Sequence, residues 1–178
     1  GDSPYQSFSA IAGNTHLIDF DLLTQMELLK ETDYASVNFG DDPTSVDYER
    51  IFYARRPILE TAVKNFLANQ AFQADFKHFE KNNQLWLDDF AEFMAIKEYF
   101  GNQALQKWDD KKAVARDPKT LEKYRTMLAE QIQYFKVTQY FFFKQWGELK
   151  DYANQKGIKI IGDMPIYVAA DSVEVWTK

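Results

Sequence analysis

The chain has 178 residues, and its 46% hydrophobic and 27% charged residues are typical of a folded globular domain, which excludes a disordered protein. Its 21 Lys and Arg residues are scattered and outnumbered by 27 Asp and Glu, so the net charge of −6 excludes the basic patch of a nucleic-acid-binding protein. The chain has no Cys, only two His, no Gly-rich phosphate loop and no apolar run of membrane-spanning length. We therefore expect a cytoplasmic protein with no metal, no cofactor, no nucleic-acid partner and no membrane partner.

Taken in chain order, the sequence opens with a polar and aromatic loop over residues 1–10 and then predicts mainly helices. A short helix is expected near residues 22–29, followed by a loop over residues 33–47 that is rich in turn residues. The next helix is predicted to begin around Pro57, because the missing N–H of proline costs nothing in the first helical turn. Its apolar residues fall on one helical face: Ile58, Leu59, Ala62, Val63, Phe66 and Leu67.

The second half of the sequence predicts further helices and one strand. Two helices, a shorter and a longer one, are expected before Gly101, which is typical of a helix C-terminus. Another helical stretch, interpreted as a single long helix, begins after Asp117 and continues to about Gln155. Gly157 closes it, and the continuously apolar residues 158–162 are typical of a buried parallel strand.

Asp163 stands at the end of this predicted strand. A carboxylate in that position, after a helix and a short apolar strand, is typical of a parallel barrel, and barrel enzymes carry their chemistry at that rim. The paired acids Asp88 and Asp89 are instead expected on a solvated helix face. Tyr5 and Tyr167 have the apolar ring and polar tip that suit a sugar-binding surface.

Five segments distributed over essentially the whole chain carry a family resemblance. They are residues 1–6 (GDSPYQ), 8–14 (FSAIAGN), 86–91 (WLDDFA), 139–146 (QYFFFKQW) and 162–169 (GDMPIYVA). Together and in this order they resemble 4-alpha-glucanotransferase, also called amylomaltase or disproportionating enzyme. The resemblance implies a mainly α-helical fragment of an α/β barrel of the TIM type, in which a helical insertion lies between two barrel-strand segments.

The same resemblance implies three parts. Residues 1–21 would be a barrel loop near the active site, residues 22–117 a helical insertion subdomain, and residues 118–178 a long helix, a barrel strand and the following loop. The chain would be an internal fragment of an enzyme that transfers alpha-1,4-glucan segments between sugar acceptors in maltodextrin, starch or glycogen metabolism. Its expected partner is an alpha-1,4-glucan or a maltooligosaccharide.

The resemblance also implies a retaining mechanism, which uses a nucleophilic carboxylate and an acid/base carboxylate. No catalytic residue is expected in this fragment, because in the family both carboxylates lie beyond the position of Lys178, so the fragment alone is expected to be inactive. Asp163 matches the first conserved barrel acid of the family, and Tyr5 matches an aromatic residue that packs on the sugar. The other candidate substrate-binding residues are Ser3, Gln6, Asp171 and Ser172.

Two other interpretations remain open. A helical interaction module would also explain the aromatic-rich helices, and it predicts one continuous exposed apolar patch. A fragment of another barrel glycosidase of the alpha-amylase superfamily would share the acid Asp163 at the strand end. The loop over residues 2–6 and the size of the helical insertion favour the glucanotransferase.

Overall fold

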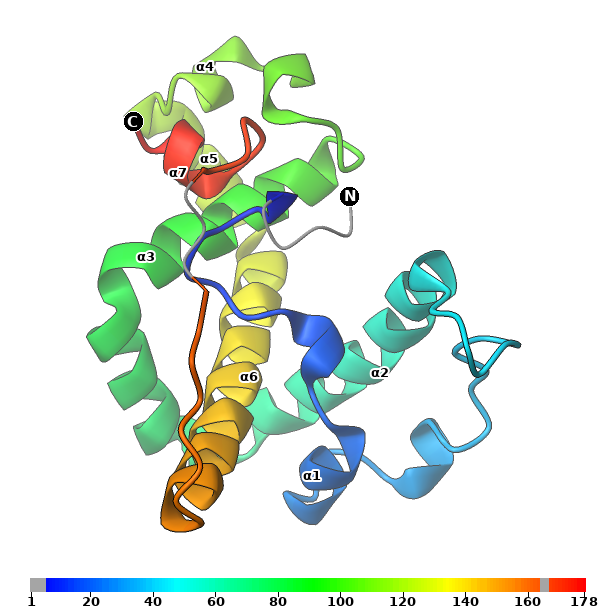
Figure 1. Ribbon diagram of the computed structural model, residues 1–178. Coiled ribbons are helices and arrows are strands. Elements are labelled where there is room, and N and C mark those ends of the chain that lie inside the picture. The colour runs from blue at the N-terminus through cyan, green and yellow to red at the C-terminus, as the bar shows by residue number, and fades with distance from the viewer. Residues whose placement is uncertain (1–5, 164–166) are drawn as a thin grey trace. The chain divides into compact units, whose positions relative to one another are not determined.

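The computed structural model describes residues 6–163 and 167–178, and helices make up most of them (Figure 1). The α-helices of this part are α1 Phe20–Gln25, α2 Tyr48–Ala68, α3 Gln73–Tyr99, α4 Lys111–Val114, α5 Pro118–Met127, α6 Ala129–Gln155 and α7 Val173–Trp176. Short 3-10 helices precede or connect them: η2 Thr15–Leu17 before α1, and η3 Glu31–Asp33, η4 Gln70–Phe72 and η5 Leu105–Lys107 between later helices. Among the described helices, none combines the length and the apolar character that a bilayer span requires.

The helices belong to two compact units, each assembled from separated stretches of chain. The first unit contains Gly1–Ala12, Glu80–Lys136 and Ile161–Lys178. The second unit contains Gly13–Phe79 and Val137–Ile160. The helices α3 and α6 each contribute residues to both units. The candidate substrate-binding residues that the structure describes, Gln6, Asp163, Asp171 and Ser172, all fall in the first unit.

Aspartate side chains begin four of the helices. Asp19, Asp47, Asp110 and Asp117 occupy the N-caps of α1, α2, α4 and α5, where their carboxylates accept hydrogen bonds from backbone N–H groups of the first turn. Each such cap contributes about 1 kcal/mol, because it satisfies donors that have no partner inside the helix. Pro118 follows Asp117 at the start of α5, as the sequence predicted.

Two helix ends that the sequence predicted are confirmed. The helix α3 ends at Tyr99, and Gly101 follows with a φ of +67°. The helix α6 ends at Gln155, and Gly157 follows with a φ of +74°. Glycine is favoured at both positions because it adopts a positive φ without the steric cost that a Cβ atom brings.

Three predictions about helices are wrong. The helix around Pro57 begins nine residues earlier, at Tyr48, because Asp47 supplies a side-chain cap and the helix tolerates the proline in its interior. The two helices expected before Gly101 are one continuous helix, α3. The expected single helix up to Gln155 is two helices, α5 and α6, which are separated at the buried Leu128. No Gly or Pro marks that break, so packing overrides the local helix propensity there.

The predicted strand is also absent from the described residues. Residues 158–163 are non-helical, but none of them is assigned to a strand. A strand exists only through hydrogen bonds to a neighbouring strand, and no such neighbour is present among the described segments. Ile158, Ile160 and Ile161 consequently remain exposed instead of filling a core.

The core of the second unit is built around the fully buried ring of Phe66 on α2. The rings of Phe72, Phe76, Tyr140 and Phe141 surround it, with ring centroids 5.2–5.4 Å away. Three of these contacts are edge-to-face or tilted, the arrangements that the quadrupoles of aromatic rings favour. Aromatic packing therefore fixes α2 against the residues of α6 that belong to this unit.

A buried amide fastens the start of the second unit to α6. Gln139, which is 1% exposed, accepts a hydrogen bond from the N–H of Gly13 at 2.7 Å and donates to the carbonyl of Gly13 at 3.0 Å. Gly13 also lies so close to Phe142 that a Cβ atom on it would stand 1.9 Å from the ring. Only glycine fits there, because a side chain would displace a packed aromatic ring.

The core of the first unit contains the completely buried Trp108. Its ring lies 5.6 Å from the ring of Phe93, 5.4 Å from that of Phe100 and 6.2 Å from that of Trp176. Its indole N–H donates to the carbonyl of Gln103 at 3.1 Å, so the one polar atom of this side chain is satisfied. This cluster joins α3, the segment before α4, and α7.

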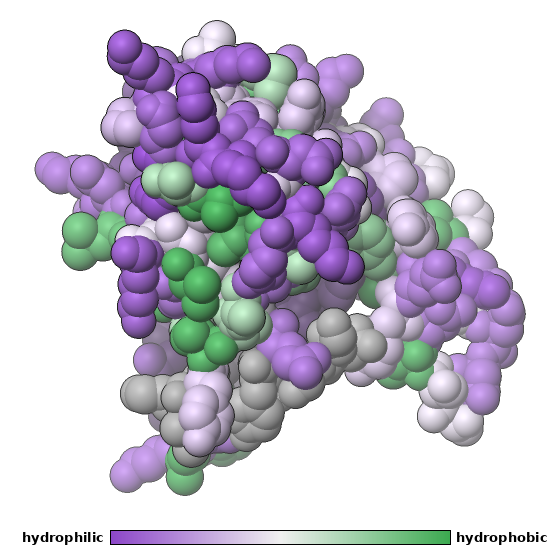
Figure 2. Space-filling model, turned by 90° about the horizontal axis from the view of Figure 1, so that it is seen from above, coloured by the Kyte–Doolittle hydropathy of each residue, from purple (hydrophilic) through white to green (hydrophobic). Residues whose placement is uncertain are grey.

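Most of the surface seen in Figure 2 is hydrophilic. This view looks from above onto the end of the molecule that carries α4 and α7 in Figure 1. The apolar residues on this face form small patches separated by charged and polar side chains. On this face the distribution is usual for a globular protein, and the view shows no continuous apolar patch of the kind expected for an interaction module.

The hydroxyl of Tyr124 makes the stability of the first unit depend on pH in the alkaline range. Burial, together with the nearby carboxylate of Asp110 that accepts its hydrogen bond at 3.2 Å, raises the pKa of Tyr124 to about 12 from an ordinary value of 10.0. The stability that this group contributes is therefore fully present below pH 10 and is lost as the pH rises towards about 12. Tyr124→Phe should lose less unfolding free energy than the wild type across this interval, as measured by urea denaturation. The exposed Tyr53→Phe is the control, and equal losses in all three proteins would contradict the prediction.

Candidate functional site

A tight turn is formed by residues 9–12, which overlap the end of the polar segment predicted at the start of the chain. The hydroxyl of Ser9 accepts hydrogen bonds from the N–H groups of Ile11 and Ala12, at 3.1 and 3.2 Å. Ser7 donates from its own hydroxyl to the Ser9 carbonyl at 2.7 Å. Serine favours such turns because its short side chain reaches nearby backbone groups. Ser9 is 6% exposed, so these bonds are largely shielded from water.

The turn is fastened to α7 near the other end of the chain. One carboxylate oxygen of Glu174, Oε1, accepts from the Ser9 hydroxyl at 3.0 Å and from the Ala10 N–H at 2.8 Å. The backbone adds a third bond, from the N–H of Val173 to the carbonyl of Phe8 at 2.9 Å. Residues 6–12 and the segment around α7 are therefore held together by charge-assisted and backbone hydrogen bonds.

Asp171, just before α7, pairs with a buried lysine. Lys97 on α3 is 1% exposed, and its ammonium nitrogen lies 2.5 Å from Asp171 Oδ2 and 2.9 Å from the carbonyl of Gln103. The other carboxylate oxygen of Asp171 accepts from the N–H of Leu105 at 2.9 Å. The ammonium group also stands 4.7 Å from the ring centroid of Phe8, within the range of a cation–π interaction.

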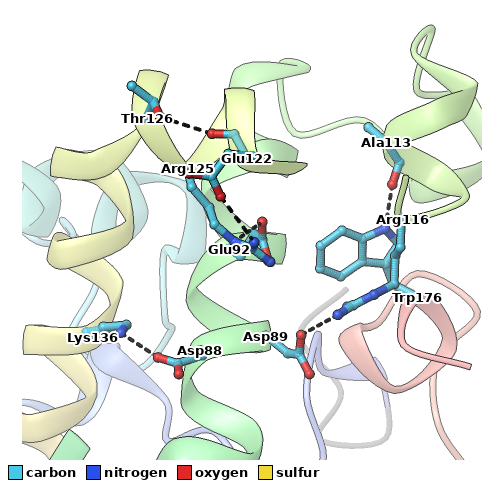
Figure 3. Close-up of polar contacts among 10 residues, drawn as sticks. All are labelled: Asp88, Asp89, Glu92, Ala113, Arg116, Glu122, Arg125, Thr126, Lys136 and Trp176. Atoms are coloured by element: carbon cyan, nitrogen blue, oxygen red, sulfur yellow. Dashed lines mark hydrogen bonds and ion pairs between the residues drawn. The ribbon is translucent and has the colours of Figure 1, made fainter. Parts of the chain in front are cut away.

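Trp176 anchors the far end of α7. Its side chain is 3% exposed, and its indole N–H donates to the carbonyl of Ala113 at 3.0 Å, as Figure 3 shows. Its ring lies 5.7 Å from that of Phe93, and the guanidinium of Arg116 stands 4.3 Å from its centroid. The segment from Asp171 to Trp176 is thus fixed at both ends.

Ion pairs along α3 complete this part of the first unit. Three acids of the helix each face a base from another segment, with N···O distances of 2.5, 2.6 and 3.0 Å: Asp88 with Lys136, Asp89 with Arg116, and Glu92 with Arg125 (Figure 3). Burial raises the pKa of the Glu92 carboxyl, although Arg125 opposes this effect. Asp88 and Asp89, which the sequence placed on a solvated helix face, have side chains that are 55% and 36% exposed, and each also forms an ion pair.

The structure places four of the six candidate substrate-binding residues. Gln6 and Asp163 are exposed, Asp171 is engaged as described above, and Ser172 is completely buried. All four belong to the first unit. The other two candidates, Ser3 and Tyr5, lie outside the described residues.

No metal centre accompanies these residues in the described part of the chain. Residues 6–163 and 167–178 contain no group of three or more His, Asp or Glu side chains that could hold a metal ion. A pocket of about 580 Å³ lies in the second unit, and it is lined by Asp47, Glu49, Arg50, Tyr53 and Ala54. None of the candidate residues contributes to it. The candidate residues therefore lie on segments that hydrogen bonds and an ion pair hold in place, and Gln6 and Asp163 are exposed on them.

Sequence reasoning missed Lys97 and Glu174, which brace the candidate site. Lys97 is the one cation in the apolar run from Phe93 to Phe100, which is a signal that it is buried and paired. Its partner lies 74 residues away, and Glu174 is 165 residues from Ser9. Neither partner can be identified from local sequence.

Comparison with known proteins gives a consistent result. The sequence model of the family described as 4-alpha-glucanotransferase matches residues 1–178. The 4-alpha-glucanotransferases of Streptococcus pneumoniae serotype 4 and of Clostridium butyricum are 56% and 46% identical to the chain, over 99% of it in both cases. The chain spans 35% of the length of the first relative and 36% of the second.

A solved structure agrees in sequence and in fold. The structure titled amylomaltase from Streptococcus agalactiae in complex with acarbose superposes with a TM-score of 0.96 at 61% sequence identity. The match covers 99% of this chain and 35% of that one. With the family model matching from the first residue to the last, the chain belongs to the 4-alpha-glucanotransferase family.

Proposed function

We propose that the chain is part of an enzyme that transfers alpha-1,4-glucan segments between sugar acceptors. The observation that carries this proposal is the 61% identity, at a TM-score of 0.96, with an amylomaltase whose structure contains acarbose. The substrate of this protein would be an alpha-1,4-glucan or a maltooligosaccharide. The enzyme would act in the maltodextrin metabolism of the cytoplasm.

The chemistry of a retaining transferase defines what the enzyme must supply. A carboxylate attacks the anomeric carbon, while a carboxylic acid protonates the departing glycosidic oxygen, so the donor is cleaved and a glycosyl–enzyme ester forms. The same acid/base residue, now ionised, takes a proton from an acceptor hydroxyl, whose oxygen bonds to the anomeric carbon while the bond from that carbon to the nucleophilic carboxylate breaks and frees the carboxylate. The family resemblance puts both carboxylates beyond the position of Lys178, and no acid among residues 1–178 is proposed in either role.

Within this chain, we propose that Asp163 supports the catalytic centre and that Tyr5 packs on the sugar. Gln6, which is exposed, and Ser3 would add polar contacts from the same loop. The described contacts give Asp171 a more specific part, because both of its oxygens are already bonded within the protein.

Asp171 and its buried neighbour Ser172 would then serve substrate binding by holding the loop that precedes α7.

The exposed isoleucines at residues 158–161 support a barrel in the longer protein. An apolar segment that ends in an acid suits a parallel barrel strand, and pairing with strands from outside this chain would bury the side chains that are exposed here. The three-part division into a barrel loop, a helical insertion and a final helix–strand–loop segment is proposed on the same grounds.

The test is a disproportionation assay. A full-length enzyme carrying this segment is incubated with maltotriose, and the products are separated by chromatography. We expect glucose together with longer maltodextrins from the full-length enzyme and unchanged maltotriose from the 178-residue chain alone. Absence of transfer by the full-length enzyme would refute the proposed function, and transfer by the 178-residue chain would refute the assignment of the catalytic carboxylates.

A further inference from the structure

The side chain of Glu174 connects the N-terminal and C-terminal stretches of chain that belong to the first unit. The carboxylate of Glu174 accepts both the Ser9 hydroxyl and the Ala10 N–H through Oε1. Its other oxygen, Oε2, is buried and has no hydrogen-bond partner within the described part of the chain. A buried anionic oxygen without a partner is costly, so a purely stabilising role does not account well for a carboxylate at this position.

Glu174 is itself held on an anchored segment. Asp171 on one side of it is bonded to Lys97 and Leu105, and Trp176 on the other side is buried and bonded to Ala113. The acceptor that faces the turn over residues 9–12 is therefore fixed by the rest of the unit. A fixed acceptor fixes in turn the group that donates to it.

We propose that Glu174 is a positioning residue for sugar binding. It holds Ser9 and Ala10 and thereby sets the place of Gln6, the exposed candidate in the same segment. This inference rests on the proposed function, because it assumes that this segment contacts the glucan. No bond of the reaction is made or broken at Glu174.

The expected consequence is a loss of affinity more than of chemical rate. Without the carboxylate, the described links of residues 6–12 to α7 and α3 include the backbone bond from Val173 to Phe8 and the contact of Phe8 with Lys97, but no longer the two bonds to Glu174. The segment then spends part of its time away from its binding position, and the apparent affinity falls by the fraction that remains in place. In a full-length enzyme, Glu174→Ala should raise the KM for maltotriose about tenfold, the effect of losing a charge-assisted hydrogen bond, and change kcat less than about twofold.

The experiment combines kinetics with amide hydrogen exchange in the full-length enzyme. In Glu174→Ala, exchange in the peptide that contains residues 6–12 should be faster than in the wild type, while the melting temperature changes by less than about 3 °C. Ser9→Ala should raise KM in the same direction, and the double variant should be no worse than the more affected single variant, because both changes remove one link. Glu130→Ala, an exposed acid in the first turn of α6, is the matched control and should behave like the wild type.

Several results would overturn the inference. An unchanged KM in Glu174→Ala would do so, whether or not exchange became faster. A parallel loss of kcat, substrate affinity and melting temperature would assign Glu174 a merely structural role. A wild-type enzyme that does not disproportionate maltotriose would instead refute the proposed function, while the exchange measurement would still show whether Glu174 holds residues 6–12.

Discussion

Asp163→Asn is expected to lower kcat in a full-length enzyme roughly 30- to 1000-fold while changing KM much less. A group that supports the catalytic centre acts more strongly in the transition state than in the ground state, and losing one charge-assisted contact of this kind costs on the order of 2–4 kcal/mol. Steady-state kinetics with maltotriose would measure the effect. Tyr5→Ala should mainly raise KM, since a ring that packs on sugar binds ground and transition states more evenly.

The control for this prediction is Asp151→Asn, which removes an exposed carboxylate from the C-terminal half of α6. It should leave kcat and the melting temperature unchanged. An Asp163→Asn enzyme of normal stability and near-normal kcat would show that Asp163 has no part in the chemistry. A loss of activity accompanied by an equal loss of stability would assign it a structural role.

The buried pair of Lys97 and Asp171 should give the largest effect on stability, and the effect should be unequal for the two partners. The Lys97 side chain is 2% exposed and the Asp171 side chain is 25% exposed. Asp171→Asn leaves an ammonium group buried without an anion and should cost about 3–5 kcal/mol of unfolding free energy. Lys97→Met leaves a carboxylate that water reaches and that keeps its bond from the Leu105 N–H, so it should cost less.

Urea denaturation of the two single variants and the double variant would measure this difference. The double variant Lys97→Met/Asp171→Asn should recover part of the loss caused by Asp171→Asn, because it removes the unpaired charge. Glu122→Gln provides the control, as its carboxylate is 74% exposed and pairs with Arg125 at 3.7 Å, an ion pair worth little. Equal costs for the two single variants would contradict the prediction.

Features of the fold that depend on neighbouring residues were predictable from the sequence, and those that depend on distant residues were not. Gly101 and Gly157 mark helix ends because their positive φ values are a local requirement. The break at Leu128 has no local signal, since leucine favours helices and only its packing explains the change. Residues 158–162 have the apolar pattern of a strand, but a strand also needs a neighbour to pair with.

The candidate site shows the same division. The sequence singled out Asp171 by family resemblance, but it did not indicate that Lys97 and Leu105 occupy both oxygens of this carboxylate. It also gave no reason to select Glu174, whose partners Ser9 and Ala10 lie near the opposite end of the chain. Such contacts depend on the topology of the fold, which brings distant residues together, and local periodicity in the sequence does not predict it.

The separation between Ser9 and Glu174 has a consequence for synthesis on the ribosome. The two residues are 165 positions apart. At about 5–20 residues per second, Ser9 is incorporated on the order of 10–30 s before Glu174. During that interval Lys97 has no Asp171 to pair with, and the rings of Phe93 and Trp108 have no Trp176 to cover them. The nascent chain therefore exposes an aromatic cluster, and transiently exposed hydrophobic surface of this kind is what makes incomplete chains prone to aggregation and dependent on chaperones.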